Sequence, residues 1–207
     1  MLFTINNIDY HKGDNQILDK TSLNIVARQN TLLLGPSGCG KTTLMNLMTG
    51  LLKPSSGEVT FEDVNYASLS GRDMDKLRAD NFGFVFQTLH LIEHLTVSQN
   101  IALAQTTPNP ERVQTLINDL GLSGKETQKA RELSVGEAQR VAIARAVANN
   151  PKVIFADEPT SALDDDNTKK VIELLFDQAE KTGATIIAAT HDDRIKKHFE
   201  KILEIAA

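Results

Sequence analysis

The chain has 207 residues, which is enough to bury a full hydrophobic core and typical of one domain. Its net charge of −5 argues against a general nucleic-acid binder, so we expect no nucleic-acid partner. The single cysteine, Cys39, excludes a disulfide within the chain. The sequence has neither a basic start nor a long apolar run, which predicts no signal peptide and a soluble, intracellular protein.

The N-terminal part of the chain is predicted to contain short strands, turns and helices. Apolar residues recur at strand or helix spacing, and residues 13–15 mark a hairpin-like turn. The strands are expected at Phe3–Ile8, Leu23–Val26, Thr31–Leu34, Gly57–Phe61 and Phe82–Phe86, and the helices at Leu44–Leu51 and Met74–Ala79.

The pattern changes to helices and loops between residues 88 and 150, and strands return after Pro151. The middle helices are expected at Val97–Ala104, Glu111–Leu120 and Glu137–Ala148, after a looser piece at Lys125–Glu132. The later elements are strands at Val153–Ala156, Thr185–Ala189 and Ile202–Ile205, and helices at Thr168–Lys181 and Asp193–His198. Strands linked by helices at both ends of the chain predict an α/β sheet with a helical insertion between them.

A phosphate-binding pattern lies between the third strand and the first helix. Gly35, Gly40, Lys41 and Thr42 match G-x-x-x-x-G-K-[ST], whose backbone N–H groups form an anion-binding nest at a helix N-terminus. Lys41 can reach the β- and γ-phosphates, and the Thr42 hydroxyl can bind Mg²⁺. A glycine-rich turn without a ligand is the alternative, but the flanking strand and helix favour a nucleoside triphosphate. The residues predicted to bind it are Gly35, Pro36, Ser37, Gly38, Cys39, Gly40, Lys41, Thr42 and Thr43.

An apolar strand from Val153 ends in two acids, Asp157 and Glu158. Such runs are typical of a central parallel strand, whose carboxyl end faces the ligand crevice. Asp157 is predicted to hold the magnesium shell through water, and Glu158 to orient and deprotonate the attacking water. The alternative is a strand end that carries solvated acids.

A second anion-binding pattern precedes the Ala-rich helix. Ser134 and Glu137 have the spacing of a capping box. Ser134, Gly136 and a helix N-terminus could also form a phosphate-binding surface. Since the chain already has a phosphate-binding turn, a second surface suggests that a nucleotide is shared between two copies.

Together these motifs resemble those of ATP-binding cassette (ABC) ATPases over essentially the whole chain. They stand in the family's order: the turn at 35–43, Gln87, the signature at 133–137, the acidic strand end at 153–158, Ser161–Asp164 and His191. The resemblance implies a single α/β domain with a P-loop ATPase core at 1–87 and 151–207 and a mainly parallel sheet. It also implies an N-terminal antiparallel β subdomain and a helical subdomain at 88–150 inserted before the signature motif.

The resemblance implies ATP and Mg²⁺ as cofactors and a head-to-tail dimer of two copies. Ser134 and the Gly136 amide would touch the γ-phosphate of an ATP held by the other copy. Gln87 would sense the magnesium ion and the attacking water, and His191 would hold the γ-phosphate.

Further roles are implied at both ends of the chain. Tyr10 matches the aromatic residue that stacks on adenine, although an ordinary half-buried strand tyrosine is the alternative. Ser161–Asp164 would cross the dimer interface, which places Asp164 among the nucleotide-binding residues. Asp165 and Asp166 are interpreted as a solvated helix start.

The signature departs from the family pattern at Val135, where a glycine is usual. We expect valine to resist a positive φ and to add bulk facing the partner copy, which would slow turnover. The Glu137 carboxylate is expected to point away from the phosphates and to serve the helix N-terminus.

The segment His90–His94 matches H-x-x-E-H, a zinc-protease pattern that needs both histidines on one helix. Its place between Gln87 and Leu95–Val97 instead resembles the family's loop that faces a membrane partner.

The residues at 81–87, with Leu95–Val97 and Asn100, are similar to cassettes of the lipoprotein-release and macrolide-export group. We therefore expect the ATPase subunit of an ABC transporter, peripheral on the inner face of the membrane through a separately encoded permease. The alternative is a nucleotide-gated regulator of the cell-division type, which controls a membrane complex without transport. Soluble DNA-repair or ribosome-acting cassettes are disfavoured, because the chain has no long coiled-coil insertion and no basic excess.

Overall fold

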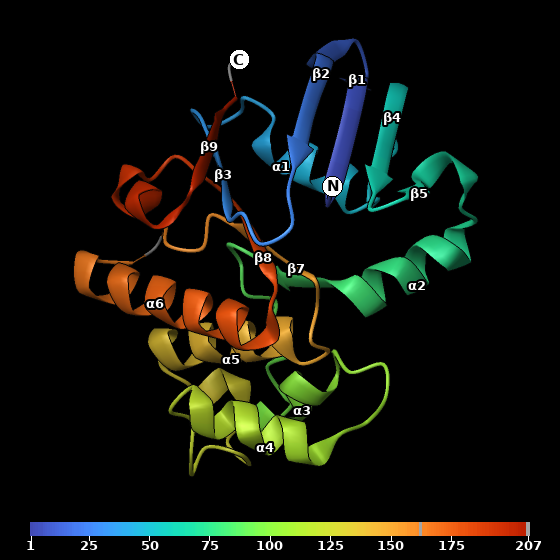
Figure 1. Cartoon of the computed structure of the whole chain (residues 1–207). Coiled ribbons are helices and arrows are strands. Elements are labelled where there is room, and N and C mark those ends of the chain that lie inside the picture. The colour runs from blue at the N-terminus through green and yellow to red at the C-terminus, as the bar shows by residue number, and fades with distance from the viewer. Residues whose placement is uncertain (162, 206–207) are drawn as a thin grey trace. The chain divides into compact units, whose positions relative to one another are not determined.

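The computed structural model describes residues 1–161 and 163–205, which form two compact units (Figure 1). The first unit comprises Met1–Arg78 and the segment from Ile187 onward, and the second unit is Ala79–Ile186. Helix α2 (Gly71–Asn81) and strand β8 (Thr185–Thr190) pass from one unit to the other along the chain.

The first unit opens with an antiparallel sheet in the order β2-β1-β4-β5. Its strands are β1 (Phe3–Lys12), β2 (Asn15–Ile25), β4 (Ser56–Phe61) and β5 (Val64–Asn65). The sheet has its core where Phe3 faces Phe61 across β1 and β4, with ring centroids 5.0 Å apart. This sheet confirms the expected N-terminal antiparallel part.

Parallel strands follow in the same unit. Strand β3 (Thr31–Leu34) is fully buried and pairs in parallel with β8 and with β9 (Lys201–Glu204). Helix α1 (Lys41–Met48) begins seven residues after β3 ends and contacts β4. Two 3₁₀ helices complete the unit, η1 (Tyr66–Ser68) and η3 (Asp193–His198).

The second unit is organised around helix α5 (Val135–Val147), which contacts strand β6 (Phe82–Val85) and three other helices (Figure 1). These helices are α3 (Val97–Ala102), α4 (Pro110–Asp119) and α6 (Asp165–Thr182). Strand β6 pairs in parallel with β7 (Val153–Asp157), and the 3₁₀ helix η2 (Ala130–Glu132) precedes α5. Helix α5 is rich in alanine and apolar residues and is buried on most of its faces. It therefore lies at the centre of the hydrophobic core of this unit.

The expected fold class, an α/β core with parallel strands, an antiparallel N-terminal sheet and a helical part, is confirmed. The differences lie in the first two strands and at helix starts. Strand β1 runs on to Lys12 instead of ending at Ile8, and β2 begins at Asn15 rather than at Leu23. Helices α1, α5 and α6 begin two or three residues earlier than the apolar spacing predicts, because their caps at Gly40, Ser134 and Asp164 precede the first apolar residue. Short elements such as β5 and η1 were not expected from the sequence.

Among the described residues, no helix combines the length and the apolar character that crossing a membrane requires.

Close packing of α5 against β6 depends on Gly83. A Cβ at this position would lie 2.0 Å from the Ala146 carbonyl oxygen, which belongs to the backbone of α5 and cannot move aside cheaply. We predict that Gly83→Ala lowers the free energy of unfolding by about 1–3 kcal/mol, measured by urea titration. Gly71→Ala is the matched control, because nothing lies within 4 Å of its Cβ position, and it should change stability by less than about 0.5 kcal/mol. Equal effects of the two changes would contradict the packing argument.

Candidate functional site: a phosphate turn, an acidic strand end and a helix start

The phosphate-binding turn joins β3 to α1 in the first unit. Gly40 is the N-cap of α1 and has φ 99°, a left-handed conformation that favours glycine. It offers no side chain to cap the helix. A helix N-terminus without a capping side chain is suited to bind an anion. Glycine is required at position 35 for lack of space rather than for its φ. A Cβ there would lie 2.4 Å from the Ile205 carbonyl oxygen and 2.7 Å from the Cys39 sulfur. The turn therefore has the backbone that its sequence pattern predicts.

Lys41 lies folded over the start of this turn. Its Nζ donates to the carbonyl oxygens of Gly35 at 2.8 Å and of Pro36 at 3.0 Å, and the residue is only 6% exposed. A buried lysine is unusual unless its charge is used. A role of this ammonium group toward phosphate oxygens remains a prediction.

His191 follows the neighbouring strand at the same level. Leu34 of β3 pairs with Thr190 of β8, so Gly35 and His191 are the next residues on two adjacent parallel strands. Adjacent strands lie about 5 Å apart, which puts the backbone of His191 beside the start of the phosphate turn. The first unit thus brings His191 and the phosphate turn together.

Tyr10 lies one strand away from the same turn. It is half-buried in β1 and pairs with Leu18 of β2, whose Cδ2 atom is 3.1 Å from the position of a Cβ on Gly40. Directly paired residues of antiparallel strands point to the same face of the sheet. The adenine-stacking role remains a prediction, and the position of Tyr10 is compatible with it.

The second unit brings Gln87 and the acidic strand end together. Val85 pairs with Ala156 in the parallel pair β6 and β7, and Gln87 and Glu158 each follow this pair by two residues. Carboxyl ends of parallel strands meet at one edge, where ligands bind in α/β folds. Asp157 is the last residue of β7, so this edge carries an amide and two carboxylates.

Glu158 has an uncommon backbone. Its φ is 47°, in the left-handed region, although a proline follows it and favours extended backbone. Ser161 closes a turn on the Glu158 carbonyl, with its N–H at 3.3 Å and its hydroxyl at 3.2 Å. Such a conformation costs about 1–3 kcal/mol and is concentrated at functional sites.

Ser134 caps α5 through a reciprocal capping box. Its hydroxyl oxygen accepts from the Glu137 N–H at 3.4 Å, while Glu137 Oε2 accepts from the Ser134 N–H at 2.8 Å and from its hydroxyl at 2.9 Å. Lys125 forms an ion pair with Glu137 at 2.9 Å. The Lys125 ammonium, and then the Ser134 N–H and hydroxyl, lower the pKa of Glu137 to about 2. As expected, Glu137 serves the helix N-terminus.

The expectation that Val135 must resist a positive φ is wrong. Val135 is the first residue of α5 and has the negative φ of a helix, so valine carries no backbone strain here. Its side chain is nevertheless 66% exposed, beside Ser134. Gly136 leaves open space, since a Cβ there would meet only Arg140 Nη1 at 3.7 Å. The effect of Val135 therefore reduces to an apolar side chain on the outer surface.

The loop after Gln87 is held by hydrogen bonds from Arg145, which the sequence analysis did not name, and from Asn100, whose contacts it did not predict. Arg145 of α5 donates to the carbonyl oxygens of Leu89 and His90, both at 2.6 Å. Asn100 is fully buried and donates to three carbonyls of the loop, while its Oδ1 accepts from the Ile92 N–H at 2.8 Å. An arginine within the Ala-rich helix is the signal that could have indicated this contact.

The H-x-x-E-H match at His90–His94 lies in this loop, not on a helix. The two histidines therefore do not share one helix face, which the zinc-protease arrangement requires.

Asp164 is the N-cap of α6. It accepts from the Asn167 N–H at 2.8 Å and from Asn167 Nδ2 at 2.9 Å, and these bonds lower the pKa of Asp164. A role toward nucleotide remains a prediction. Of the segment 161–164 expected at a dimer interface, Ala162 lies outside the described residues.

The residues predicted to bind magnesium offer suitable donors. Thr42 is exposed at the first turn of α1, and Gln87 and Asp157 lie at the carboxyl edge of β6 and β7. Hydroxyl, amide and carboxylate oxygens suit Mg²⁺, which usually takes one or two carboxylates together with substrate phosphates. Each of these side chains thus carries an oxygen donor of the kind that suits the ion, and a shared magnesium site remains a prediction.

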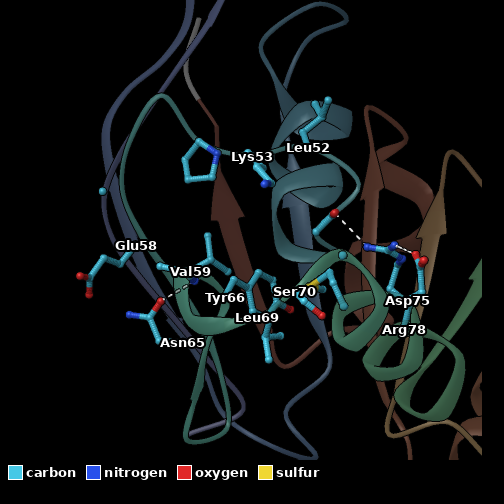
Figure 2. Close-up of a pocket in the computed structure, with 16 residues that line it drawn as sticks. Leu52, Lys53, Glu58, Val59, Asn65, Tyr66, Leu69, Ser70, Asp75 and Arg78 are labelled. Carbon is cyan, nitrogen blue, oxygen red and sulfur yellow. Dashed lines mark hydrogen bonds and ion pairs between the residues drawn. The ribbon is translucent and has the colours of Figure 1, made fainter.

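A separate cavity of about 410 Å³ lies in the first unit, lined by residues between Gly50 and Arg78 (Figure 2). Arg78 is paired with Asp75 and donates to the Gly50 carbonyl at 2.9 Å. Tyr66 donates to the Met48 carbonyl at 2.6 Å, and burial raises its pKa. These polar groups serve the protein's own backbone, and none of the predicted site residues lines the cavity.

The ion pair between Lys125 and Glu137 predicts that the free energy of unfolding depends on pH. A folded pKa of about 2, below the ordinary value of 4.5, means that the carboxylate stabilises the fold above about pH 4.5. This contribution is lost as the pH falls toward 2. Glu137→Gln should lower the free energy of unfolding by about 0.5–1 kcal/mol at pH 7, and the difference from wild type should vanish near pH 2. Urea titrations across this range measure it.

Glu132→Gln is the control for that series, because Glu132 is exposed and its ion pair with Arg131 is long, at 3.8 Å. A difference between wild type and Glu137→Gln that is the same at pH 7 and pH 2 would contradict the assignment.

Comparison with known proteins agrees with this geometry. The family profile described as "ABC transporter" matches residues 18–161. The Escherichia coli "Macrolide export ATP-binding/permease protein MacB" is 38% identical over 204 residues, which cover 95% of this chain and 31% of that protein. An uncharacterised ABC transporter ATP-binding protein of Mycobacterium tuberculosis is 37% identical over 196 residues, which cover 92% of this chain and 79% of that protein. The chain thus spans about a third of the MacB relative and most of the mycobacterial one.

Solved structures give the same result. The dimeric ATP-binding cassette MJ0796, in a post-hydrolysis state bound to ADP and Pi, has a TM-score of 0.86 at 34% identity. The alignment covers 98% of this chain and 94% of that one. CbiO1 from Clostridium perfringens, part of the ABC transporter complex cbiONQ, has a TM-score of 0.89 at 29% identity. This alignment covers 99% of the present chain and 84% of CbiO1. The chain belongs to the ABC transporter family and is an ATP-binding cassette of that family.

Proposed function

We propose that the chain hydrolyses ATP to ADP and phosphate as the nucleotide-binding subunit of an ABC transporter. The observation that carries this proposal is the phosphate turn at the N-terminus of α1, with Gly40 in the left-handed conformation and Lys41 buried over the turn. Backbone amides and an ammonium group in this arrangement bind the phosphates of a nucleotide.

The roles proposed for the individual residues are those that the motifs of the family imply. The turn amides and Lys41 hold the triphosphate, and His191, at the adjacent strand end, holds the γ-phosphate. Glu158 takes a proton from water, whose oxygen attacks the γ-phosphorus while the bridging oxygen leaves with ADP. Gln87, which follows β6 at the level of Glu158, orients the same water. Tyr10 stacks on the adenine.

Magnesium would be held by Thr42, Gln87 and Asp157, and when bound it supplies neutralisation of the charge that develops on the phosphate oxygens. The amides and hydroxyls of the chain provide the remaining stabilisation.

A second copy of the chain completes the site. Ser134 and Gly136 lie at an exposed helix N-terminus, where an anion is favoured by the helix dipole. The dimers of the relative MJ0796 support such an assembly. We propose a head-to-tail dimer, in which Ser134 and Gly136 of one copy contact the γ-phosphate held by the other and Asp164 lies near the interface.

The membrane partner is proposed to be a separate permease, which the loop at 88–96 contacts from the cytoplasmic side. The relatives named as macrolide export and ABC transporter proteins support a transport role over a regulatory one. Copurification with a multi-span membrane protein and permease-dependent movement of a substrate would support transport. Assembly of a membrane complex without such movement would favour the regulatory alternative.

Glu158 carries the sharpest catalytic prediction. Glu158→Gln removes the base but keeps the size of the side chain, so hydrolysis should fall by about 10²–10⁴-fold while ATP binding and the ATP-dependent dimer persist. Phosphate release, a fluorescent ATP analogue and size-exclusion chromatography measure these properties. Glu173→Gln, an exposed acid on α6, is the control and should hydrolyse ATP at the wild-type rate. Unchanged hydrolysis by Glu158→Gln would remove Glu158 from the mechanism.

Replacing Val135 by glycine is expected to strengthen dimerisation or to raise the rate of ATP hydrolysis. Val135→Gly removes the exposed apolar side chain beside Ser134, so ATP-dependent dimerisation should tighten or hydrolysis should accelerate several-fold. Val26→Gly makes the same chemical change at another exposed valine, which is 45% exposed, and should have neither effect. If Val135→Gly behaves like Val26→Gly, the valine is neutral.

A further inference from the structure

The turn that follows Glu158 has a conformation that its own sequence does not favour. Glu158 has φ 47° before a proline, where extended backbone is usual. The hydrogen bonds from Ser161 close the turn over Pro159 and Thr160. The direction of the Glu158 side chain therefore depends on whatever holds this turn in place.

A side chain of helix α5 holds the turn after Glu158 in place. Gln139 of α5 donates from Nε2 to the Pro159 carbonyl oxygen at 3.1 Å. Both residues are buried, and Gln139 is only 5% exposed. A buried backbone carbonyl needs a hydrogen-bond donor, so the amide of Gln139 fixes the residue directly after Glu158.

The same helix begins at Ser134. Gln139 follows this N-cap by five residues, a rise of about 7.5 Å along a helix. A helix buried on most of its faces is close-packed, so it transmits strain between the groups attached to it. The position of Ser134 and the position of the turn after Glu158 are thus set by one element, α5, which Figure 1 shows in the second unit.

We propose that Gln139 is a positioning residue for Glu158. Its amide holds the Pro159 carbonyl, and this keeps the Glu158 backbone in the left-handed conformation that directs the carboxylate at the attacking water. Gln139 is buried and is proposed to act through the Pro159 carbonyl rather than on the nucleotide or the water. The inference rests on the proposed hydrolysis of ATP with Glu158 as the base.

The test compares Gln139→Met with wild type, using the full chain. Methionine has the same unbranched length and no donor. We expect single-turnover ATP hydrolysis to fall at least about tenfold, since small misplacements of a catalytic group have effects of this size. The affinity for a fluorescent ATP analogue should stay within about twofold, because Gln139 does not contact the nucleotide.

Gln178→Met is the matched control. Gln178 lies on α6 in the same unit, is 1% exposed, and bonds through its amide to Asp177. It should lose thermal stability without a comparable fall in the hydrolysis rate. Equal rate losses in the two variants would identify a general effect of burying methionine and overturn the proposal.

A double-mutant cycle separates positioning from structure. In the Glu158→Gln background, Gln139→Met should cause no further fall in the rate, because the two residues act as a unit. The same fold-loss in both backgrounds, or a wild-type rate for Gln139→Met alone, would overturn the proposal. Wild-type hydrolysis by Glu158→Gln would instead overturn the catalytic role of Glu158, and with it the basis of this inference.

Gln139→Asn decides the question if the methionine variant does not fold. It keeps the amide but shortens its reach by one methylene group, so the rate should fall between those of wild type and a donor-free variant. A folded Gln139→Asn with the wild-type rate would contradict the proposal.

Discussion

Parallel strand pairing is the constraint on which the rest of this structure depends. In the first unit, β3 and β8 end side by side, so the phosphate turn and His191 start from neighbouring positions. In the second unit, β6 and β7 do the same for Gln87 and Glu158. Since side chains at carboxyl ends of parallel strands face one edge, each unit presents its polar residues where a ligand can bind.

Helix α5 adds the second constraint. Its N-terminus carries Ser134, its middle holds the turn after Glu158 through Gln139, and Arg145 near its end holds the loop after Gln87. Segments that are far apart in the sequence are thereby fixed by hydrogen bonds to one buried helix. The start of α5 at Ser134, the turn after Glu158 and the loop after Gln87 are therefore all joined to the same helix.

The motifs predicted the fold and the candidate residues because each places its chemistry locally. The run that ends at Gly35 predicts a turn at a helix start, and the acids after Phe155 predict a strand end. The contacts made by Gln139, Arg145 and Asn100 could not be predicted, because each joins side chains to backbone carbonyls that only tertiary packing brings near. The expectation of a positive φ at Val135 was wrong because of a local feature. The capping box at Ser134 lets α5 begin at the next residue, so Val135 is already helical.

Mixing two inactive variants tests the central claim, that a nucleotide is shared between copies. Lys41→Ala damages the phosphate turn, and Ser134→Arg damages the helix start that is proposed to face the partner copy. In a head-to-tail mixed dimer, one of the two sites combines the intact Lys41 of one copy with the intact Ser134 of the other. We expect ATP hydrolysis to be absent in each variant alone and to recover when the two are mixed. Full activity of Ser134→Arg alone, or no recovery from two folded variants that form mixed dimers, would contradict it.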